Sequence, residues 1–481
     1  MWAGTVEQVK FLARTGGLLL LLGFAGMGAA CASEQVDRLV EAAGRGDRAA
    51  LDSLVDMARR RKDPEADYAL GLMAYEGRGL ARNDKQALQL VERAASKGYA
   101  EASNTLGFFY EHGVGTPVDL PKAIESYRKG AQGGSAKART NLGWFYERGT
   151  AVEKDPAMAV SLYRQAAEQG LAAAHVNLAR VYQNGIGVAK NPAAAIELYE
   201  LALSGGIVAA ALQLGQLQEE SGNLARAADN YVIAAKAKVP EADFAAGRLL
   251  TSPTNPKRDL NEGISWLEAA GARGKVEAFL LLAGLFDKGD GMTRDPVRAA
   301  GYFHRAAELG DAQAAFRYAQ FLLAQAKGGP EADPLPWFRR AAEKGHPEAQ
   351  FQAARLLEQR GGDAAAKEAV AWYRKSADQG NLQAALALGI ALEAGRGTQA
   401  APDEALGWYL KAASANDPEA LFRLGNLYDS GRGTAADFGK ARDYYSRAAN
   451  LGHAEAARVL QKMTGVPPLE SLPNDPFKGM R

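Results

Sequence analysis

Residues 101–137, EASNTLGFFYEHGVGTPVDLPKAIESYRKGAQGGSAK, decide how this chain folds. In the first half, apolar residues recur at the four-residue spacing of one helix face: Ala102, Leu106 and Tyr110. Gly107 leaves room there for another helix to approach closely. The Gly-Val-Gly-Thr-Pro segment at 113–117 then interrupts the helix, because glycine and proline favour a turn. A second helix begins near Pro121, since proline suits the first turn. The stretch therefore predicts an αα-hairpin.

This hairpin pattern recurs along nearly the whole chain. A Leu-Gly or similar small pair marks each first helix, beginning at positions 70, 106, 142, 178, 214, 246, 282, 318, 353, 388 and 424. One hairpin cannot bury both of its faces, whereas hairpins stacked at a regular period bury a continuous core. We therefore predict an all-α solenoid of about eleven hairpins.

The composition supports a repeat array and excludes several classes of protein. A chain of 481 residues is too long for one compact core, whereas the core of a repeat array grows with repeat number. The 57 basic and 56 acidic residues nearly cancel, so the charge gives no reason to expect a nucleic-acid partner. A single cysteine excludes disulfides within the chain.

The amino terminus has the features of an export signal. Lys10 and Arg14 precede the apolar run 18–22 and the small-residue run that ends before Cys31. This apolar stretch is shorter than the roughly 20 residues that a membrane-spanning helix needs. The pattern predicts a signal peptide over 1–30.

The segment Gly28-Ala-Ala-Cys31 resembles the lipobox of bacterial lipoproteins, in which cleavage before the cysteine is followed by lipidation of that cysteine. The resemblance implies a lipid at Cys31, which would tether the protein to a membrane surface without spanning it. With Ala32 after the cysteine, it implies the outer membrane and a protein facing the periplasm. The alternatives are an ordinary cleaved signal, giving a soluble periplasmic protein, and an uncleaved inner-membrane anchor.

The repeats carry a recognisable consensus. The turns contain Gly-x-Gly, as in Gly77-Arg-Gly79 and Gly185-Ile-Gly187, and the second helices end in Ala-Ala followed by glycine. The pattern ALG..Y..G.GV..D..KA...Y..AA..G resembles the Sel-one-like repeat family, a relative of the tetratricopeptide repeats with a longer inter-helix loop. The resemblance covers about 65–456. It implies a right-handed superhelix and a non-catalytic scaffold for protein–protein interaction.

Changes in loop length and composition divide the chain further. We predict a lipid-attached start with capping helices at 31–64, four regular repeats at 65–208, and irregular shorter repeats forming a joint at 209–261. Repeats continue over 262–455, a capping helix covers 456–465, and the proline-rich tail 466–481 is predicted to be disordered. The basic run 59–62 is interpreted as cations at a helix C-terminus. The alternative is a binding site for anionic lipid or an acidic partner.

No catalytic or metal-binding pattern is present in the sequence. The five histidines lie in different repeats without metal-ligand spacing: His112, His175, His304, His346 and His453. Each Gly-x-Gly lies between helices rather than after a strand, which favours turn geometry over phosphate binding. Some secreted family members are linked to β-lactam hydrolysis, but those are cysteine-rich. We therefore expect no enzyme activity, cofactor, metal or small-molecule substrate.

Two aromatic residues mark a candidate partner-binding groove. Phe108 and Trp144 follow the Leu-Gly pair in consecutive repeats, a position that points into the concave groove in tetratricopeptide proteins. The groove would also contain charged and polar residues of the same two helices: Glu111, His112, Glu147 and Arg148. Aromatic and arginine side chains are common anchors of interfaces. The alternative is that these residues only pack neighbouring repeats together.

The resemblance also implies a cellular role. Several lipoproteins of this repeat class and size, including the scaffold of alginate secretion, serve exopolysaccharide export. We therefore expect the partners to be envelope proteins, such as an outer-membrane pore or biosynthetic machinery. The alternative is a regulator or assembly factor for peptidoglycan, pilus or flagellar machinery.

Overall fold

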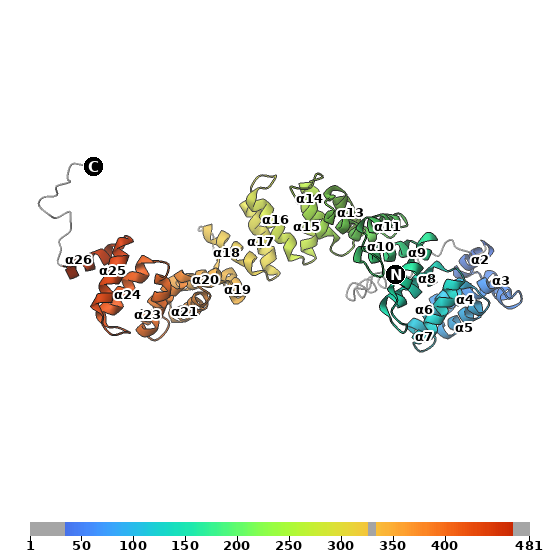
Figure 1. Cartoon of the computed structure of the whole chain (residues 1–481), viewed down its shortest axis with the longest axis horizontal. Helices are drawn as coiled ribbons and strands as arrows, with labels where there is room; N and C mark the ends of the chain where they lie inside the picture. The colour runs from blue at the N-terminus through green and yellow to red at the C-terminus, as the bar shows by residue number, and fades with distance from the viewer. Residues whose placement is uncertain (1–33, 326–332, 465–481) are drawn as a thin grey trace. The chain divides into compact units, whose positions relative to one another are not determined.

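The computed structural model describes residues 34–325 and 333–464. The predicted signal peptide, Cys31 and the predicted tail at 466–481 lie outside these residues. The described residues form 25 α-helices, α2 to α26, and include no strand, which confirms the all-α prediction. Figure 1 shows these helices in chain order.

The chain divides into two compact units, Met1–Asp259 and Leu260–Arg481. The division lies near the end of the segment 209–261, to which the sequence analysis assigned irregular repeats. It separates α14 from α15, the two helices predicted to form the sixth hairpin. The other ten predicted hairpins each lie within one unit, so the units are described separately.

The first unit begins with two capping helices and continues with five hairpins. The capping helices are α2 (Glu34–Gly44) and α3 (Arg48–Arg59). The hairpins are α4 (Pro64–Glu76) with α5 (Asp84–Ser96), α6 (Ala100–His112) with α7 (Leu120–Gln132), α8 (Ala136–Arg148) with α9 (Pro156–Glu168), α10 (Ala172–Asn184) with α11 (Pro192–Ser204), and α12 (Ala210–Glu220) with α13 (Leu224–Lys236). The helix α14 (Ala242–Thr251) ends the unit. Only residues 221–223 join α12 to α13, the shortened loop that the sequence predicts there.

The second unit begins with α15 (Leu260–Ala272) and continues with five hairpins. They are α16 (Val276–Lys288) with α17 (Pro296–Glu308), α18 (Ala312–Ala324) with α19 (Leu335–Glu343), α20 (Pro347–Arg360) with α21 (Asp363–Asp378), α22 (Leu382–Ala394) with α23 (Pro402–Ala413), and α24 (Pro418–Ser430) with α25 (Phe438–Asn450). The helix α26 (Ala454–Thr464) follows the last hairpin, at the position of the predicted capping helix.

The hairpins form because their helix ends are strongly specified. At the end of α6, Gly113 adopts a left-handed conformation with φ 72° and donates its amide to Phe109, a common way to end a helix. At the start of α7, the Asp119 side chain accepts the amide of Lys122 as an N-cap. The same glycine and Asp or Asn pairing recurs in the neighbouring repeats, so each loop turns the chain in a similar way.

A buried tyrosine occupies the centre of most hairpins. The largest fully buried side chains include seven tyrosines on second helices: Tyr127, Tyr163, Tyr199, Tyr231, Tyr373, Tyr409 and Tyr445. Within the α6–α7 hairpin the Tyr127 ring lies against Gly107, where a Cβ atom would come within 2.6 Å of the ring. Because the glycine of the Leu-Gly pair has no side chain, it leaves the space that the tyrosine ring fills.

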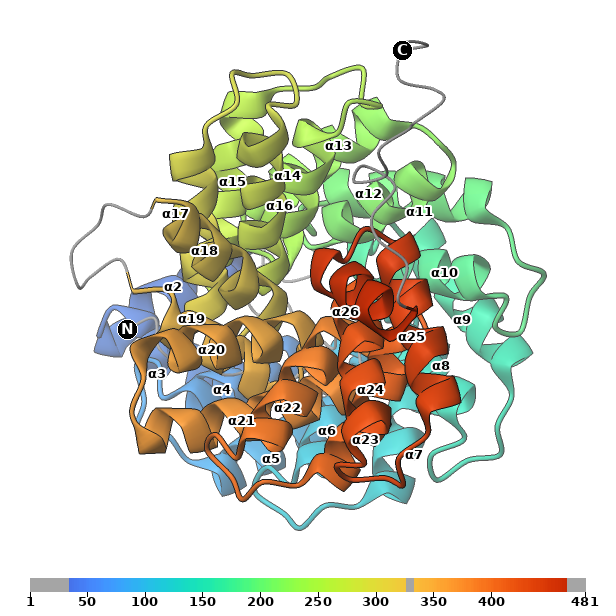
Figure 2. The ribbon, with the colours of Figure 1, turned by 90° about the vertical axis from the view of Figure 1, so that its left-hand side faces the viewer.

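Three consecutive first helices in the first unit, α6, α8 and α10, form a continuous inner surface. Helix α6 contacts α8, and α8 contacts α10, whereas second helices such as α5 and α7 approach one another less closely. A buried hydrogen bond of 2.9 Å from Asn141 to Asn104 joins α8 to α6. Figure 2 shows the helices of this unit following one another in a curved row. Elements on the inner side of a curve lie closest together, so α6, α8 and α10 line the inner side.

Candidate partner-binding surface

The six residues predicted to form a groove lie on the last two turns of α6 and α8. Phe108, Glu111 and His112 belong to α6, and Trp144, Glu147 and Arg148 hold the equivalent positions on α8, 36 residues later. We call these six residues the inner patch. The rings of Phe108 and Trp144 are half-buried, while His112 and Arg148 are exposed.

Each half of the inner patch is ordered mainly by its own helix. On α6 the Phe108 ring lies 4.2 Å from the His112 ring, centroid to centroid. On α8 the guanidinium of Arg148 lies over the Trp144 ring, 4.8 Å from its centroid. Within residues 34–325 and 333–464, no ring contact, hydrogen bond or ion pair joins the α6 members directly to the α8 members. The two halves therefore lie side by side as neighbouring parts of one inner surface.

The two glutamates form internal hydrogen bonds that the sequence did not predict. Tyr127 donates a hydrogen bond of 2.6 Å to Glu111, and Tyr163 donates one of 2.9 Å to Glu147. Both tyrosines belong to the second helix of the same hairpin, 16 residues after the glutamate. The repeated spacing of 16 residues between a glutamate and a buried tyrosine was the sequence signal that could have revealed these pairs.

Glu147 also has a cation from the next repeat. Arg180 on α10 donates two hydrogen bonds to its carboxylate, of 2.7 and 2.5 Å, and only 11% of the Glu147 side chain is exposed. Burial acts to raise the pKa of Glu147, but the bonds and charge of Arg180, the bond from Tyr163 and the charge of Arg148 together hold that pKa below its usual value. Glu147 is therefore ionised, and Arg180 already balances its charge within the protein.

Glu111 differs from Glu147 in its ion pairing. No ion pair to Glu111 occurs in the part of the chain that the structure describes. The position equivalent to Arg180 is held in the preceding repeat by Trp144, which packs against the cluster that contains Tyr127. Glu111 is thus a half-buried carboxylate that receives one hydrogen bond from a neutral donor.

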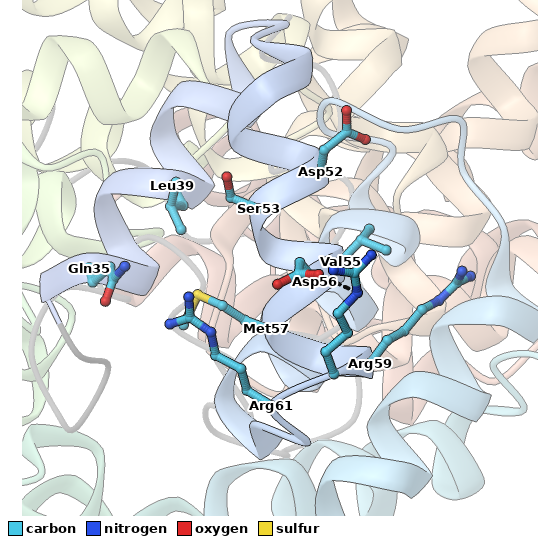
Figure 3. A pocket seen from close by; sticks show the side chains of 10 residues that line it. Gln35, Leu39, Asp52, Ser53, Val55, Asp56, Met57, Arg59 and Arg61 are labelled. Carbon is cyan, nitrogen blue, oxygen red and sulfur yellow. Dashed lines mark ion pairs between the residues drawn. The ribbon is translucent and has the colours of Figure 1, made fainter.

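A second surface feature is a shallow cavity of about 610 Å³ in the capping pair α2 and α3. It is lined by residues at the start of α2, including Gln35, and by residues at the end of α3, including Arg59 and Arg61. Figure 3 shows the Arg61 side chain extending toward the start of α2. The basic run 59–62 therefore begins at the C-terminus of α3, and its Arg61 side chain reaches toward the start of α2.

The described residues contain no group of three or more His, Cys, Asp or Glu side chains arranged to hold a metal ion. Among these same residues, no helix is both long enough and apolar enough to cross a membrane.

Hairpins stacked at a regular period, with first helices lining a shared inner surface, define an α-solenoid repeat protein. The family comparison identifies the repeat. The model described as Sel1 repeat matches residues 64–99, 100–135, 136–171, 172–207, 240–275, 277–311, 337–346, 347–381, 382–417 and 418–453. The chain therefore belongs to the Sel1 repeat family, as the resemblance of its consensus implies. Sel1 repeat proteins are typically scaffolds for protein–protein interaction.

Two solved structures of bacterial proteins are similar to this chain. The protective antigen c5321, present in uropathogenic Escherichia coli strains and displaying an SLR fold, is 25% identical to this chain, with a TM-score of 0.55. The match covers 89% of this chain and 90% of that protein. A Sel1 repeat protein from Oxalobacter formigenes is 26% identical, with a TM-score of 0.40, over 50% of this chain and 96% of its own. The comparison with curated proteins found no match.

Proposed function

We propose that this protein is a non-catalytic scaffold of the bacterial cell envelope that binds partner proteins through the inner surface of its repeats. The observation that carries the proposal is the inner patch, which combines half-buried aromatic rings with the exposed side chains of His112 and Arg148 on two adjacent first helices. Such amphipathic surfaces provide interface anchors, because aromatic and arginine side chains contribute most to binding energy. Membership of the Sel1 repeat family supports the same role.

We place the scaffold at the outer membrane, facing the periplasm and tethered through a lipid on Cys31. The support is the signal-like segment 1–30, the lipobox-like residues 28–31 and Ala32. The helix α2 begins only three residues after Cys31, at Glu34. The solved relative c5321 is a protective antigen of a bacterium, which supports a location outside the cytoplasm.

The basic residues at the end of α3 could bind the same membrane that a lipid at Cys31 would enter. Arg61 and Gln35 line the same cavity, and Gln35 lies four residues after Cys31, so the Arg61 cation would lie near a lipid at Cys31. Lysine and arginine side chains near an anionic bilayer strengthen a single lipid anchor by roughly 1 kcal/mol each. The capping pair would then face the lipid surface, and the repeats would extend from it.

The machinery we propose first is an export system for exopolysaccharide. The resemblance of the chain to envelope lipoprotein scaffolds supports this choice. An assembly role in peptidoglycan, pilus or flagellar machinery would use the same tether and the same inner surface. The identity of the co-purifying proteins separates these two roles.

The experiment is a pull-down from solubilised membranes with the full-length chain and a Cys31→Ser variant, with co-purifying proteins identified by mass spectrometry. We expect the wild-type chain to incorporate labelled fatty acid and to retain an outer-membrane pore or a polysaccharide synthase. The Cys31→Ser variant should lose the label and most of these partners. An Ala32→Gly variant, which keeps the cysteine, is the matched control.

Two results would contradict the proposal in different ways. Fatty-acid labelling that is absent from the wild-type chain would remove the tether but leave the scaffold. Cell-wall enzymes or motor proteins in place of export proteins would replace the export role with the assembly role.

A further inference from the structure

The five hydrogen bonds between a second-helix tyrosine and a glutamate of the same hairpin form a comparable set. They join Tyr127 to Glu111, Tyr163 to Glu147, Tyr231 to Glu219, Tyr373 to Glu358 and Tyr409 to Glu393. The oxygen–oxygen distances lie between 2.6 and 3.0 Å. The same local geometry therefore holds all five carboxylates.

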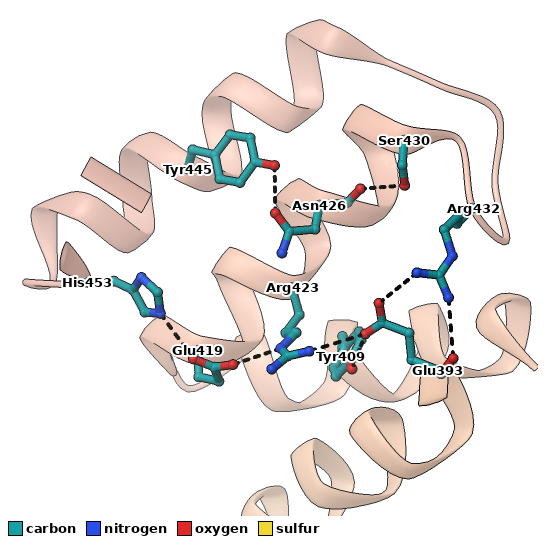
Figure 4. A network of polar contacts seen from close by, with 9 residues as sticks. All are labelled: Glu393, Tyr409, Glu419, Arg423, Asn426, Ser430, Arg432, Tyr445 and His453. Atoms are coloured by element: carbon teal, nitrogen blue, oxygen red, sulfur yellow. Dashed lines mark hydrogen bonds and ion pairs between the residues drawn. The ribbon is translucent and has the colours of Figure 1, made fainter. Parts of the chain in front are cut away.

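Four of these five glutamates also bind an arginine that the next repeat supplies. The pairs are Glu147 with Arg180, Glu219 with Arg248, Glu358 with Arg396, and Glu393 with Arg423 and Arg432. Figure 4 shows the last case, in which Glu393 receives Arg423 on one side and Arg432 on the other. A glutamate that accepts a bond from the tyrosine of its own hairpin thus usually also pairs with an arginine from the next repeat.

Glu111 is the exception among the five. Its next repeat is α8 and α9, where Trp144 occupies the position that Arg180 holds for Glu147. Arg148 lies over the Trp144 ring instead, and in the described part of the chain it forms no ion pair with Glu111. The carboxylate therefore lacks the cation that its counterparts have, and an aromatic residue holds the sequence position from which Arg180 reaches Glu147.

The electrostatics of the tyrosines show the same difference. Burial raises the pKa of Tyr163, as does the Glu147 carboxylate, while Arg180 and Arg148 act to lower it. Burial also raises the pKa of Tyr127 well above its ordinary value, with the Glu111 carboxylate adding to the effect, and no cation opposes it. Two cations therefore act on the Tyr163 hydroxyl, and none is among the groups that act on the Tyr127 hydroxyl.

We propose that Glu111, with Phe108 and Trp144 beside it, binds an arginine side chain of a partner protein. The incoming guanidinium would take the place that Arg180 takes in the next repeat. A carboxylate accepts two parallel bonds from a guanidinium, and the same planar group stacks on aromatic rings. Arginine suits this site better than lysine, because an ammonium group cannot form both contacts in one plane. This inference rests on the proposed role in protein binding, and it names the chemistry of the partner.

The test uses the purified full chain and a random peptide library displayed on phage. We expect the wild-type protein to enrich peptides that carry an arginine with apolar neighbours. A Glu111→Gln variant should bind the enriched peptide about tenfold more weakly or worse, because a charge-assisted bond pair is lost. Its thermal stability should change little, since the amide oxygen can still accept the bond from Tyr127. Replacing the peptide's arginine with lysine should weaken binding less than replacing it with glutamine.

The matched control is Glu219→Gln, the same substitution at a carboxylate that lies outside the inner patch and binds both Tyr231 and Arg248. It should leave peptide affinity within about twofold of the wild type, because this carboxylate is already paired and distant from the proposed site. It should lower thermal stability instead, since Arg248 loses its partner. Enriched peptides without arginine, or equal loss of affinity in both variants, would overturn the inference while leaving the scaffold role intact. Failure to enrich any peptide would contradict both the arginine site and binding through this surface.

Discussion

Replacing Gly115 with alanine is expected to lower the free energy of unfolding of the first unit by about 3 kcal/mol. Gly115 has a φ of 69°, a left-handed conformation that costs an alanine roughly 1 kcal/mol or more. A Cβ atom there would also overlap the carbonyl oxygen of Asp84 at the start of α5, in the preceding repeat. Relieving such an overlap by shifting the backbone costs about 1–3 kcal/mol more. Urea unfolding followed by far-ultraviolet circular dichroism measures the loss.

The matched control is Gly134→Ala. Gly134 also has a positive φ, of 100°, but nothing lies within 4 Å of a Cβ atom placed there. Only the conformational cost remains, so the expected loss is about 1 kcal/mol. Equal destabilisation by the two substitutions would show that the second glycine of the Gly-x-Gly loop does not form the close contact between repeats.

Replacing Arg180 with methionine is expected to lower the free energy of unfolding by about 2–3 kcal/mol. The change removes the cation that pairs with the Glu147 carboxylate. Only 11% of the Glu147 side chain is exposed, so water cannot fully replace that cation. Removing one member of a buried ion pair typically costs about 3–5 kcal/mol, and the partial exposure of Arg180 reduces this value. Thermal and urea unfolding of the single variant measure the effect.

The double variant Arg180→Met with Glu147→Met completes the cycle. It should recover most of the lost stability, because no unpaired charge remains and the methionine side chains fill similar volume. A loss below about 0.5 kcal/mol in the single variant would place the pair with ordinary surface ion pairs. In that case the ion pair with Arg180 would not stabilise Glu147, and the difference in pairing between Glu147 and Glu111 would have no energetic basis.

The repeat architecture could be predicted from the sequence because its signals are local and repeated. The small pair of each first helix, the glycine that ends it and the Asp or Asn that caps the next helix recur at nearly constant spacing. The structure accordingly has a hairpin at each of the ten predicted positions that lie within one unit. The division between Asp259 and Leu260 adds a finding that loop length alone did not reveal.

The inner patch could be predicted only in part. The positions of Phe108 and Trp144 on consecutive first helices follow from the 36-residue period. The partners of the two glutamates do not, because Tyr127 is 16 residues away and Arg180 is 33 residues after Glu147. Such contacts depend on how hairpins stack, which one repeat considered alone does not specify. The distinction between a paired and an unpaired carboxylate therefore required the structure.

The measurement that tests the central proposal most directly is site-specific photo-crosslinking in cells of the native host. A photoreactive phenylalanine derivative would replace His112, which is exposed in the inner patch, or Met158, which is 44% exposed on the second helix α9. We expect a discrete crosslinked species from position 112 and none from position 158. Crosslinks of equal yield at both positions, or only at position 158, would contradict binding through the inner surface.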